Sequence, residues 1–212
     1  MPMNTLQQIK THRVVAILRG CDPAHILPIV EALYAGGIRL LEITLNSRDA
    51  LSAIKETAKK FGDQLVVGAG TVLTPDEARS AIDAGAKFIL SPSLDIPTIQ
   101  RTKELGAVSI PGAFTATEIL TAWRNGADMV KVFPASVGPN YFRDLRGPLP
   151  QIPLMPTGGV NLENIRQFQH AGAAAFGVGS ALVPATEELT PSYLQQLTTS
   201  AAAYMAAVAG QP

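Results

Sequence analysis

The chain has 212 residues, of which 47% are hydrophobic and only 16% are charged, a composition that excludes extended disorder. Seventeen basic residues balance seventeen acidic ones without clustering, which argues against a nucleic-acid-binding surface or a cationic membrane-binding face. A small molecule is therefore the expected partner.

The first fifteen residues, MPMNTLQQIKTHRVV, lack the long apolar core of a signal peptide, and no later apolar run is long enough to span a bilayer. The single cysteine, Cys21, cannot form an intramolecular disulfide, which fits a reducing compartment. These features predict a cytoplasmic protein.

One pattern recurs along the chain, as in EALYAGGIRLLEI, AIDAGAKFILS and AWRNGADMVKVF. An amphipathic segment ends in a glycine, and a short apolar run follows it. Glycine just past a helix supplies the left-handed residue that ends it, and the short run is typical of a buried parallel strand. Helix starts are also marked, because Thr74, Thr115 and Asn161 each occupy a position suited to an N-cap.

Counting these runs in chain order predicts eight strands. We place them near residues 14–18, 40–44, 65–69, 87–91, 107–110, 128–133, 153–156 and 175–178. Helices are expected between successive strands, and a last one over about 190–208. Eight βα units predict the α/β class and a single-domain (β/α)8 TIM barrel over residues 1–212. An open doubly wound sheet is the alternative, disfavoured because the units recur evenly and no Rossmann glycine fingerprint is present.

The sixth predicted strand contains a lysine among apolar residues, in the segment MVKVFP. Side chains alternate along a strand, so Val130 and Val132 should face the helices. Met129, Lys131 and Phe133 should then point into the barrel.

The second predicted strand, LLEIT, contains a carboxylate in an equivalent setting. Alternation turns Leu41 and Ile43 toward the helices and Leu40, Glu42 and Thr44 toward the interior. One lysine and one carboxylate are therefore expected inside the same apolar barrel.

A desolvated lysine has a lowered pKa and is partly a free amine at neutral pH, which can form a Schiff base with a carbonyl substrate. The protonated imine is an electron sink, and an inward carboxylate can move the protons that carbon–carbon bond cleavage requires. Lys131 and Glu42 are thus the predicted catalytic pair. A purely structural ion pair is the alternative, and strand alternation alone leaves both interpretations open.

Glycines cluster after the last two predicted strands. Backbone amides of these two loops often bind a phosphate in barrels of this class, because glycine lets the backbone approach closely. The alternative is that the glycines only permit tight turns. The residues expected to line a phosphate site are Thr157, Gly158, Gly159, Gly179 and Ser180.

Two further residues follow predicted strands. Arg19 could bind a carboxylate or phosphate bidentately or lie on the rim, and Thr71 could hold a carboxylate or simply end a strand. His12, His25 and His170 lack metal-ligand spacing, so neither a metal nor another cofactor is expected.

Eight segments occur in order across nearly the whole chain: VVAILRG, EITLNS, GAGTVLTPDEA, FILSP, IPGAFTATE, KVFPA, PTGGVNLENI and GVGSALV. Together they resemble the 2-keto-3-deoxy-6-phosphogluconate (KDPG) aldolase family, including its relatives that act on the galactonate isomer. The resemblance implies a trimeric (β/α)8 class I aldolase. Such an enzyme cleaves a phosphorylated keto-deoxy sugar acid to pyruvate and glyceraldehyde 3-phosphate.

The resemblance also implies roles for individual residues. Lys131 in KVFPA matches the Schiff-base lysine, and Glu42 in EITL matches the acid/base carboxylate. Arg19 in LRG and Thr71 in GAGTV match family residues at the carboxylate end of the substrate, and the resemblance implies that Phe133 lines the pocket. The residues that match the phosphate site are Gly158, Gly159 and Ser180.

One position departs from the family. Many members carry an arginine where this chain has Asn46, and Arg48 could reach into the site instead. The LNS segment is closer to the galactonate branch, whereas PTGGV and GVGSALV resemble the gluconate branch. The natural epimer is therefore left open by the sequence.

Two other functions remain as alternatives. A non-catalytic phosphosugar-binding barrel would use the glycine loops without turnover. A phosphate-binding isomerase or synthase needs no imine and would tolerate replacement of Lys131 by methionine.

Overall fold

The computed structural model describes residues 3–186 and 188–210. The strands are β1 (Val14–Leu18), β2 (Leu40–Thr44), β3 (Val66–Gly70), β4 (Phe88–Leu90), β5 (Val108–Ile110), β6 (Gly112–Ala113), β7 (Val130–Val132), β8 (Leu154–Pro156) and β9 (Phe176–Val178). The helices are α1 (Thr5–His12), α2 (Pro23–Ala35), α3 (Ala50–Phe61), α4 (Pro75–Asp83), α5 (Ile96–Glu104), α6 (Ala116–Arg124), α7 (Pro139–Arg146), α8 (Ile165–His170) and α9 (Pro191–Val208). Two short 3-10 turns cover Gly62–Gln64 (η1) and Ala135–Val137 (η2).

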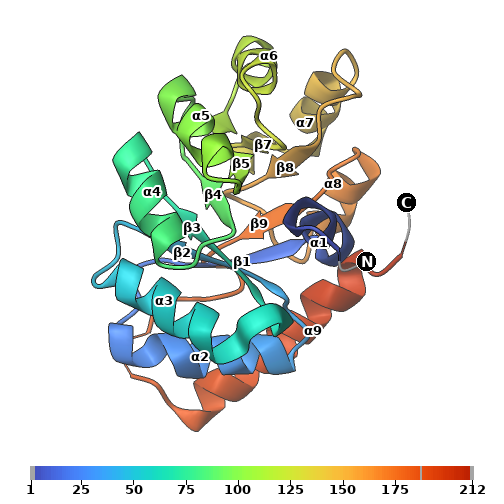
Figure 1. Cartoon of the computed structure of the whole chain (residues 1–212). Helices are drawn as coiled ribbons and strands as arrows, with labels where there is room; N and C mark the ends of the chain where they lie inside the picture. The colour runs from blue at the N-terminus through green and yellow to red at the C-terminus, as the bar shows by residue number, and fades with distance from the viewer. Residues whose placement is uncertain (1–2, 187, 211–212) are drawn as a thin grey trace.

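The strands form a closed parallel barrel surrounded by helices (Figure 1). One run of hydrogen-bonded strands has the order β5-β4-β3-β2-β1-β9, and a second has the order β6-β7-β8. Pro111 joins β5 to β6, and a parallel bridge between Thr157 and Gly177 joins the second run to β9. Since β5 and β6 form one interrupted strand, the architecture is the predicted (β/α)8 barrel.

The observed strands agree closely with those predicted, and the structure differs from the predicted elements at three places. The fifth strand is interrupted at Pro111, because proline has no amide hydrogen to donate to a ladder. Helix α1 precedes β1 and was not predicted. The N-cap prediction for Asn161 is wrong: α8 begins only at Ile165, and the Asn161 side chain instead accepts hydrogen bonds within the turn before it, including one from Asn164 N.

Two separate apolar layers confirm the predicted alternation of side chains. Leu41, Ile43, Val130 and Val132 belong to the layer between strands and helices. The interior layer contains Val15, Leu40, Val66, Phe88, Leu90, Val108, Ile110, Met129 and Met155. Ile9 of α1 also joins the interior layer, so this helix adds to the core inside the barrel.

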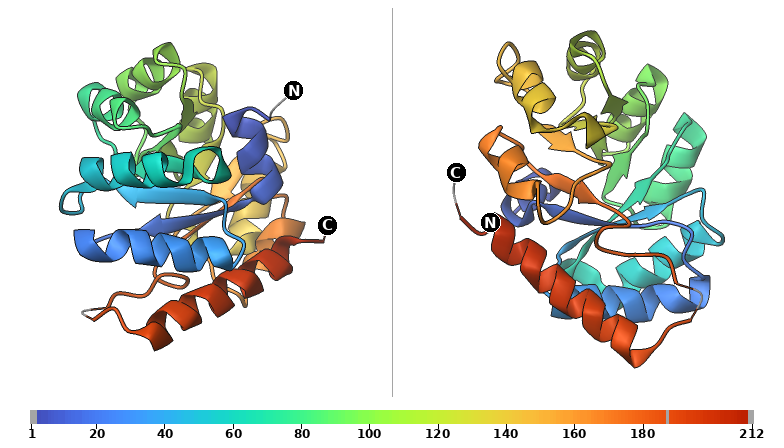
Figure 2. Two further views of the ribbon diagram at one scale, coloured as in Figure 1. Left: turned by 60° about the horizontal axis from the view of Figure 1, so that its bottom comes forward. Right: turned by 180° about the vertical axis from the view of Figure 1, so that it is seen from behind.

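The C-terminal helix α9 packs along α2, as Figure 2 shows from two sides. The Thr198 hydroxyl donates to Ala32 O at 3.0 Å. A Cβ added at Gly36 would lie 2.5 Å from the Ala201 Cβ, so the two helices approach closely at this glycine. No helix in residues 3–186 and 188–210 combines the length and the apolar character needed to cross a bilayer.

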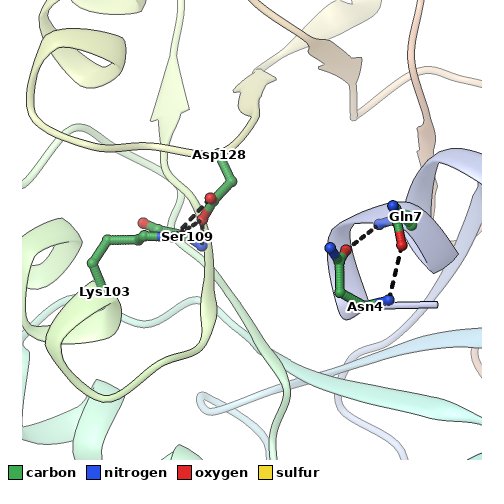
Figure 3. Close-up of polar contacts among 5 residues, drawn as sticks. All are labelled: Asn4, Gln7, Lys103, Ser109 and Asp128. Atoms are coloured by element: carbon green, nitrogen blue, oxygen red, sulfur yellow. Dashed lines mark hydrogen bonds and ion pairs between the residues drawn. The ribbon is translucent and has the colours of Figure 1, made fainter. Parts of the chain in front are cut away.

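A carboxylate fixes the start of β7 against its neighbours. Asp128 accepts from Ser109 N at 2.8 Å and from Lys103 Nζ at 2.7 Å (Figure 3). The same figure shows the capping box of α1, in which Asn4 and Gln7 exchange hydrogen bonds. Asp128 therefore ties α5, β5 and the entry to β7 together.

Replacement of Asp128 by alanine is expected to lower the free energy of unfolding by about 1.5–3 kcal/mol, because it leaves the Ser109 amide without its charged acceptor. Lys103→Ala is the matched control. Its side chain is 39% exposed, so losing the ion pair should cost less than about 1 kcal/mol. Urea unfolding followed by circular dichroism measures both values. Equal losses in the two variants would contradict this division.

Candidate active site

Lys131 and Glu42 both lie inside the barrel. Lys131 is the central residue of β7 and is 1% exposed, and Glu42 is the central residue of β2 and is fully buried. Each follows a residue of the interior layer by two positions, Met129 and Leu40 respectively. The strand pattern thus places an amine and a carboxyl in one apolar interior, as predicted.

Burial perturbs both groups. Burial lowers the pKa of the Lys131 amine below its ordinary value, which the Glu42 charge opposes and the Arg19 charge reinforces. Burial raises the pKa of the Glu42 carboxyl, against the opposing effects of Lys131 and Arg19. Both shifts favour the neutral forms, an amine that can attack and a carboxyl that can give up a proton.

Glu42 and Lys131 do not form a direct ion pair. The salt bridges among the described residues join other partners, and neither carboxylate oxygen of Glu42 has a hydrogen-bond partner. A buried polar group without a partner costs free energy and calls for an explanation. The structural ion pair considered from the sequence is therefore absent among the described residues, and the Glu42 carboxyl remains available to a ligand.

Glycines on β3 make room for this carboxyl. Glu42 is in register with Gly68 on the neighbouring strand. A Cβ at Gly70 would overlap the Glu42 carboxylate, and a Cβ at Gly68 would overlap the Phe88 ring. The two glycines of the GAG segment therefore leave room for the Glu42 carboxylate and the Phe88 ring, as glycine within a strand often does where another group approaches closely.

A pocket of about 450 Å³ opens at the carboxyl ends of β1, β7, β8 and β9. It is lined by seven residues predicted from the sequence: Arg19, Phe133, Thr157, Gly158, Gly159, Gly179 and Ser180. Neither Lys131 nor Glu42 lines it. Phe133 forms the common wall, because its ring centroid lies 5.0 Å from Lys131 Nζ.

Thr157 and the three pocket glycines contribute different features to the pocket, a hydroxyl in the case of Thr157 and a particular backbone conformation in the case of two of the glycines. Thr157 is 3% exposed, and its hydroxyl oxygen has no hydrogen-bond partner in the described part of the chain, so it can accept or donate a hydrogen bond. Gly158 and Gly159 have φ angles of +81° and +87°, which favour glycine. Gly179 has no such φ, and a Cβ there would meet nothing within 4 Å. A tight turn therefore explains the first two glycines but not the third.

Thr71 is the predicted substrate-binding residue that does not line this pocket. It follows β3 with a φ of +54°, a rare conformation for a β-branched residue. Such local strain is found most often at functional sites. Arg19 lines the pocket from the end of β1, and its side chain is exposed.

The structure corrects the suggestion that Arg48 reaches into the site. Its guanidinium donates to Asp22 at 2.9 Å on the surface, and it does not line the pocket. Asn46 is exposed. Sequence reasoning missed Asn161 as a lining residue, and it missed Gly70, whose position two residues after another glycine within a strand was the available signal.

The fold and the site define a (β/α)8 barrel with an interior lysine, a separate interior carboxyl and a glycine-lined pocket at the carboxyl ends of its last strands. The family model described as "KDPG and KHG aldolase" matches residues 6–197. The chain belongs to this family.

Individual relatives agree with this assignment. The chain is 36% identical over 197 residues to 2-dehydro-3-deoxy-6-phosphogalactonate aldolase of Escherichia coli K12, covering 92% of this chain and 96% of that protein. It is 37% identical over 158 residues to 2-dehydro-3-deoxy-phosphogluconate aldolase of Pseudomonas aeruginosa, covering 74% and 71%. Its fold matches that of KDPG aldolase from Legionella pneumophila, solved with pyruvate captured as a covalent carbinolamine, with a TM-score of 0.86, 29% identity and coverage of 94% and 98%.

Proposed function

We propose that this protein is a class I aldolase, a carbon–carbon lyase that cleaves 2-keto-3-deoxy-6-phosphogluconate or its galactonate epimer to pyruvate and D-glyceraldehyde 3-phosphate. The observation that carries the proposal is the buried Lys131 amine with a lowered pKa, facing the same interior as an unpaired carboxyl. The names of the relatives support the substrate class.

The proposed reaction starts with attack of the neutral Lys131 amine on the C2 ketone. Glu42, kept protonated by its raised pKa, donates its proton to the departing hydroxyl of the carbinolamine. Water leaves, a protonated imine that withdraws electrons from C3 remains, and Glu42 is left as a carboxylate. Glu42 removes the proton of the C4 hydroxyl, the C3–C4 bond breaks, and its electron pair forms an enamine as the aldehyde leaves. Protonation at C3 and addition of water then release pyruvate and regenerate the amine.

The two ends of the substrate are assigned to different parts of the site. Arg19 and Thr71 are proposed to hold the carboxylate end, and Phe133 to pack on the pyruvyl part. The pocket at the ends of β8 and β9 is proposed to hold the phosphate. Its residues there are Thr157, Gly158, Gly159, Gly179 and Ser180. Two left-handed glycines and an unpartnered hydroxyl support this placement, because they present donors without side chains in the way.

A coupled lactate dehydrogenase assay with each epimeric substrate tests the proposal. Pyruvate release with at least one epimer is expected, and the ratio of kcat/KM values identifies the preferred one. The alternative, a non-catalytic phosphosugar-binding barrel, predicts a higher melting temperature with ligand but no pyruvate. That result would overturn the proposal.

Three broader properties belong to the same proposal. The domain is proposed to cover residues 1–212, the protein to work in the cytoplasm, and three identical chains to form a homotrimer. The family resemblance supports the trimer, the single cysteine supports a reducing compartment, and the balanced charge argues against nucleic-acid partners. Light scattering at micromolar concentration tests the trimer.

A further inference from the structure

A chain of hydroxyl groups connects the ends of β1 and β2. Gly20 N donates to Ser47 Oγ at 2.8 Å, Ser47 Oγ lies 3.0 Å from Thr44 Oγ1, and Thr44 Oγ1 donates to Leu18 O at 3.3 Å. Thr44 is the last residue of β2 and is fully buried, and Ser47 is half-buried in the turn that follows.

Counting protons fixes the direction of this chain. A carbonyl oxygen only accepts, so the single Thr44 proton points to Leu18 O. Ser47 must then donate to Thr44 and accept from Gly20. The three hydrogen bonds therefore run in one direction, from Gly20 N to Ser47, from Ser47 to Thr44, and from Thr44 to Leu18 O.

The two ends of the chain lie on either side of Arg19. Leu18 contributes the carbonyl that precedes Arg19, and Gly20 contributes the amide that follows it. The backbone on each side of Arg19 is therefore hydrogen-bonded to a residue that follows Glu42 closely in the chain, Thr44 on one side and Ser47 on the other. Gly20 has a φ of +65° and would have no neighbour within 4 Å of a Cβ, so side-chain packing does not hold it.

We propose that Ser47 is a positioning residue for Arg19, acting through Thr44 to hold the guanidinium beside the two interior ionisable groups and the pocket. The inference rests on the proposed function, in which Arg19 holds the substrate's carboxylate end. Arg19 lines the pocket, and its charge acts on both Lys131 and Glu42.

A second link between the same two loops is weaker. Arg48 pairs with Asp22 at 2.9 Å, but their side chains are 69% and 47% exposed. Exposed pairs of this kind contribute little to rigidity or stability. Arg48→Ala is therefore a matched control that cuts the loop contact without touching the hydroxyl chain.

Kinetics of four single variants and one double variant test the inference. Ser47→Ala should raise KM about tenfold with kcat nearly unchanged, because Arg19 contacts the substrate in the ground state as well as the transition state. Ser47→Thr retains the hydroxyl and should restore KM, and Arg48→Ala should leave it unchanged. In an Arg19→Ala background, Ser47→Ala should have no further effect, since the two changes remove one interaction.

A second measurement does not depend on turnover. The rate of Lys131 acetylation by trace acetic anhydride, followed by peptide mass spectrometry, reports the fraction of free amine against pH. The charges acting on Lys131 are Glu42 from β2 and Arg19 after β1. A loosened Arg19 would depress the Lys131 pKa less, so the labelling midpoint should move to higher pH in Ser47→Ala.

The outcomes separate the two proposals. If the parent protein releases no pyruvate from either epimer, the aldolase function is rejected. The midpoint of Lys131 labelling then decides the role of Ser47. An unchanged midpoint overturns the role of Ser47. So does an equal effect of Ser47→Ala with and without Arg19, because Ser47 would then act on the general stability of the loop.

Discussion

Lys131→Met is expected to lower the rate of pyruvate release by at least about four orders of magnitude, the scale of loss when a catalytic nucleophile is removed. Methionine is apolar and flexible enough to fill the space of the lysine, so the barrel should remain folded. The coupled lactate dehydrogenase assay measures the rate, and far-ultraviolet circular dichroism checks the fold. Lys87→Met, at an exposed lysine that precedes β4, is the control and should keep full activity.

Reduction with borohydride in the presence of pyruvate tests the same residue directly. The parent protein and Lys87→Met should each gain one reduced pyruvyl adduct on Lys131, located by peptide mass spectrometry. Lys131→Met should gain none. Pyruvate release by Lys131→Met, or an adduct on another lysine, would show that Lys131 is not the residue that forms the imine.

The same substitution has a stability effect with a defined sign. Between the lowered folded-state pKa of Lys131 and its ordinary value, the unfolded chain binds more protons than the folded chain, so stability rises with pH. Inside that window folding must release a proton from the amine, and below it the folded state buries the charged amine, and each costs stability. Lys131→Met removes this cost and should raise the melting temperature at neutral pH. Measuring melting temperature from pH 6 to 9 shows whether the slope is reduced as expected.

Gly70→Ala is expected to lower kcat by about 10²–10⁴-fold, the usual contribution of a general acid–base group. The added Cβ would occupy the position of the Glu42 carboxylate and displace it, although residue 70 carries no reactive group. Glu42→Gln should produce a loss of similar size, since it removes proton transfer while preserving volume.

Gly147→Ala is the matched control for this second prediction. Its φ is −51°, and a Cβ there would meet the nearest atom at an ordinary 3.7 Å. It should therefore leave kcat unchanged. Full activity in Gly70→Ala would show that Glu42 can occupy another position and still act, or that it has no part in the reaction.

Much of the fold could be predicted because it follows from local rules. Short apolar runs, several of them after glycine-terminated helices, identified all eight barrel strands. Alternation along β2 and β7 placed Glu42 and Lys131 inside. Helix α1 was missed because it contributes only one fully buried residue, Ile9, and so shows little periodicity. Its capping box, Asn4 with Gln7, was a readable signal.

What could not be predicted depends on contacts between elements. The hydroxyl of Ser47 acquires its function only because the ends of β1 and β2 are adjacent in register. The surface pairing of Arg48 with Asp22 likewise depends on where two loops meet. Strand alternation also gave no information on whether Lys131 and Glu42 pair directly, since it fixes the face of a side chain and not its distance from another.

The barrel consists of two runs of strands that meet at Pro111 and at the Thr157–Gly177 bridge, with Lys131 in the shorter run and Glu42 in the longer. The segment 112–157 can therefore be treated as a cassette in enzyme engineering. Grafting the matching segment of a relative would exchange the nucleophile and Thr157 together, while the carboxyl and Arg19 stay with the recipient. Chimaeras built this way would assign substrate preference to one part of the ring or the other.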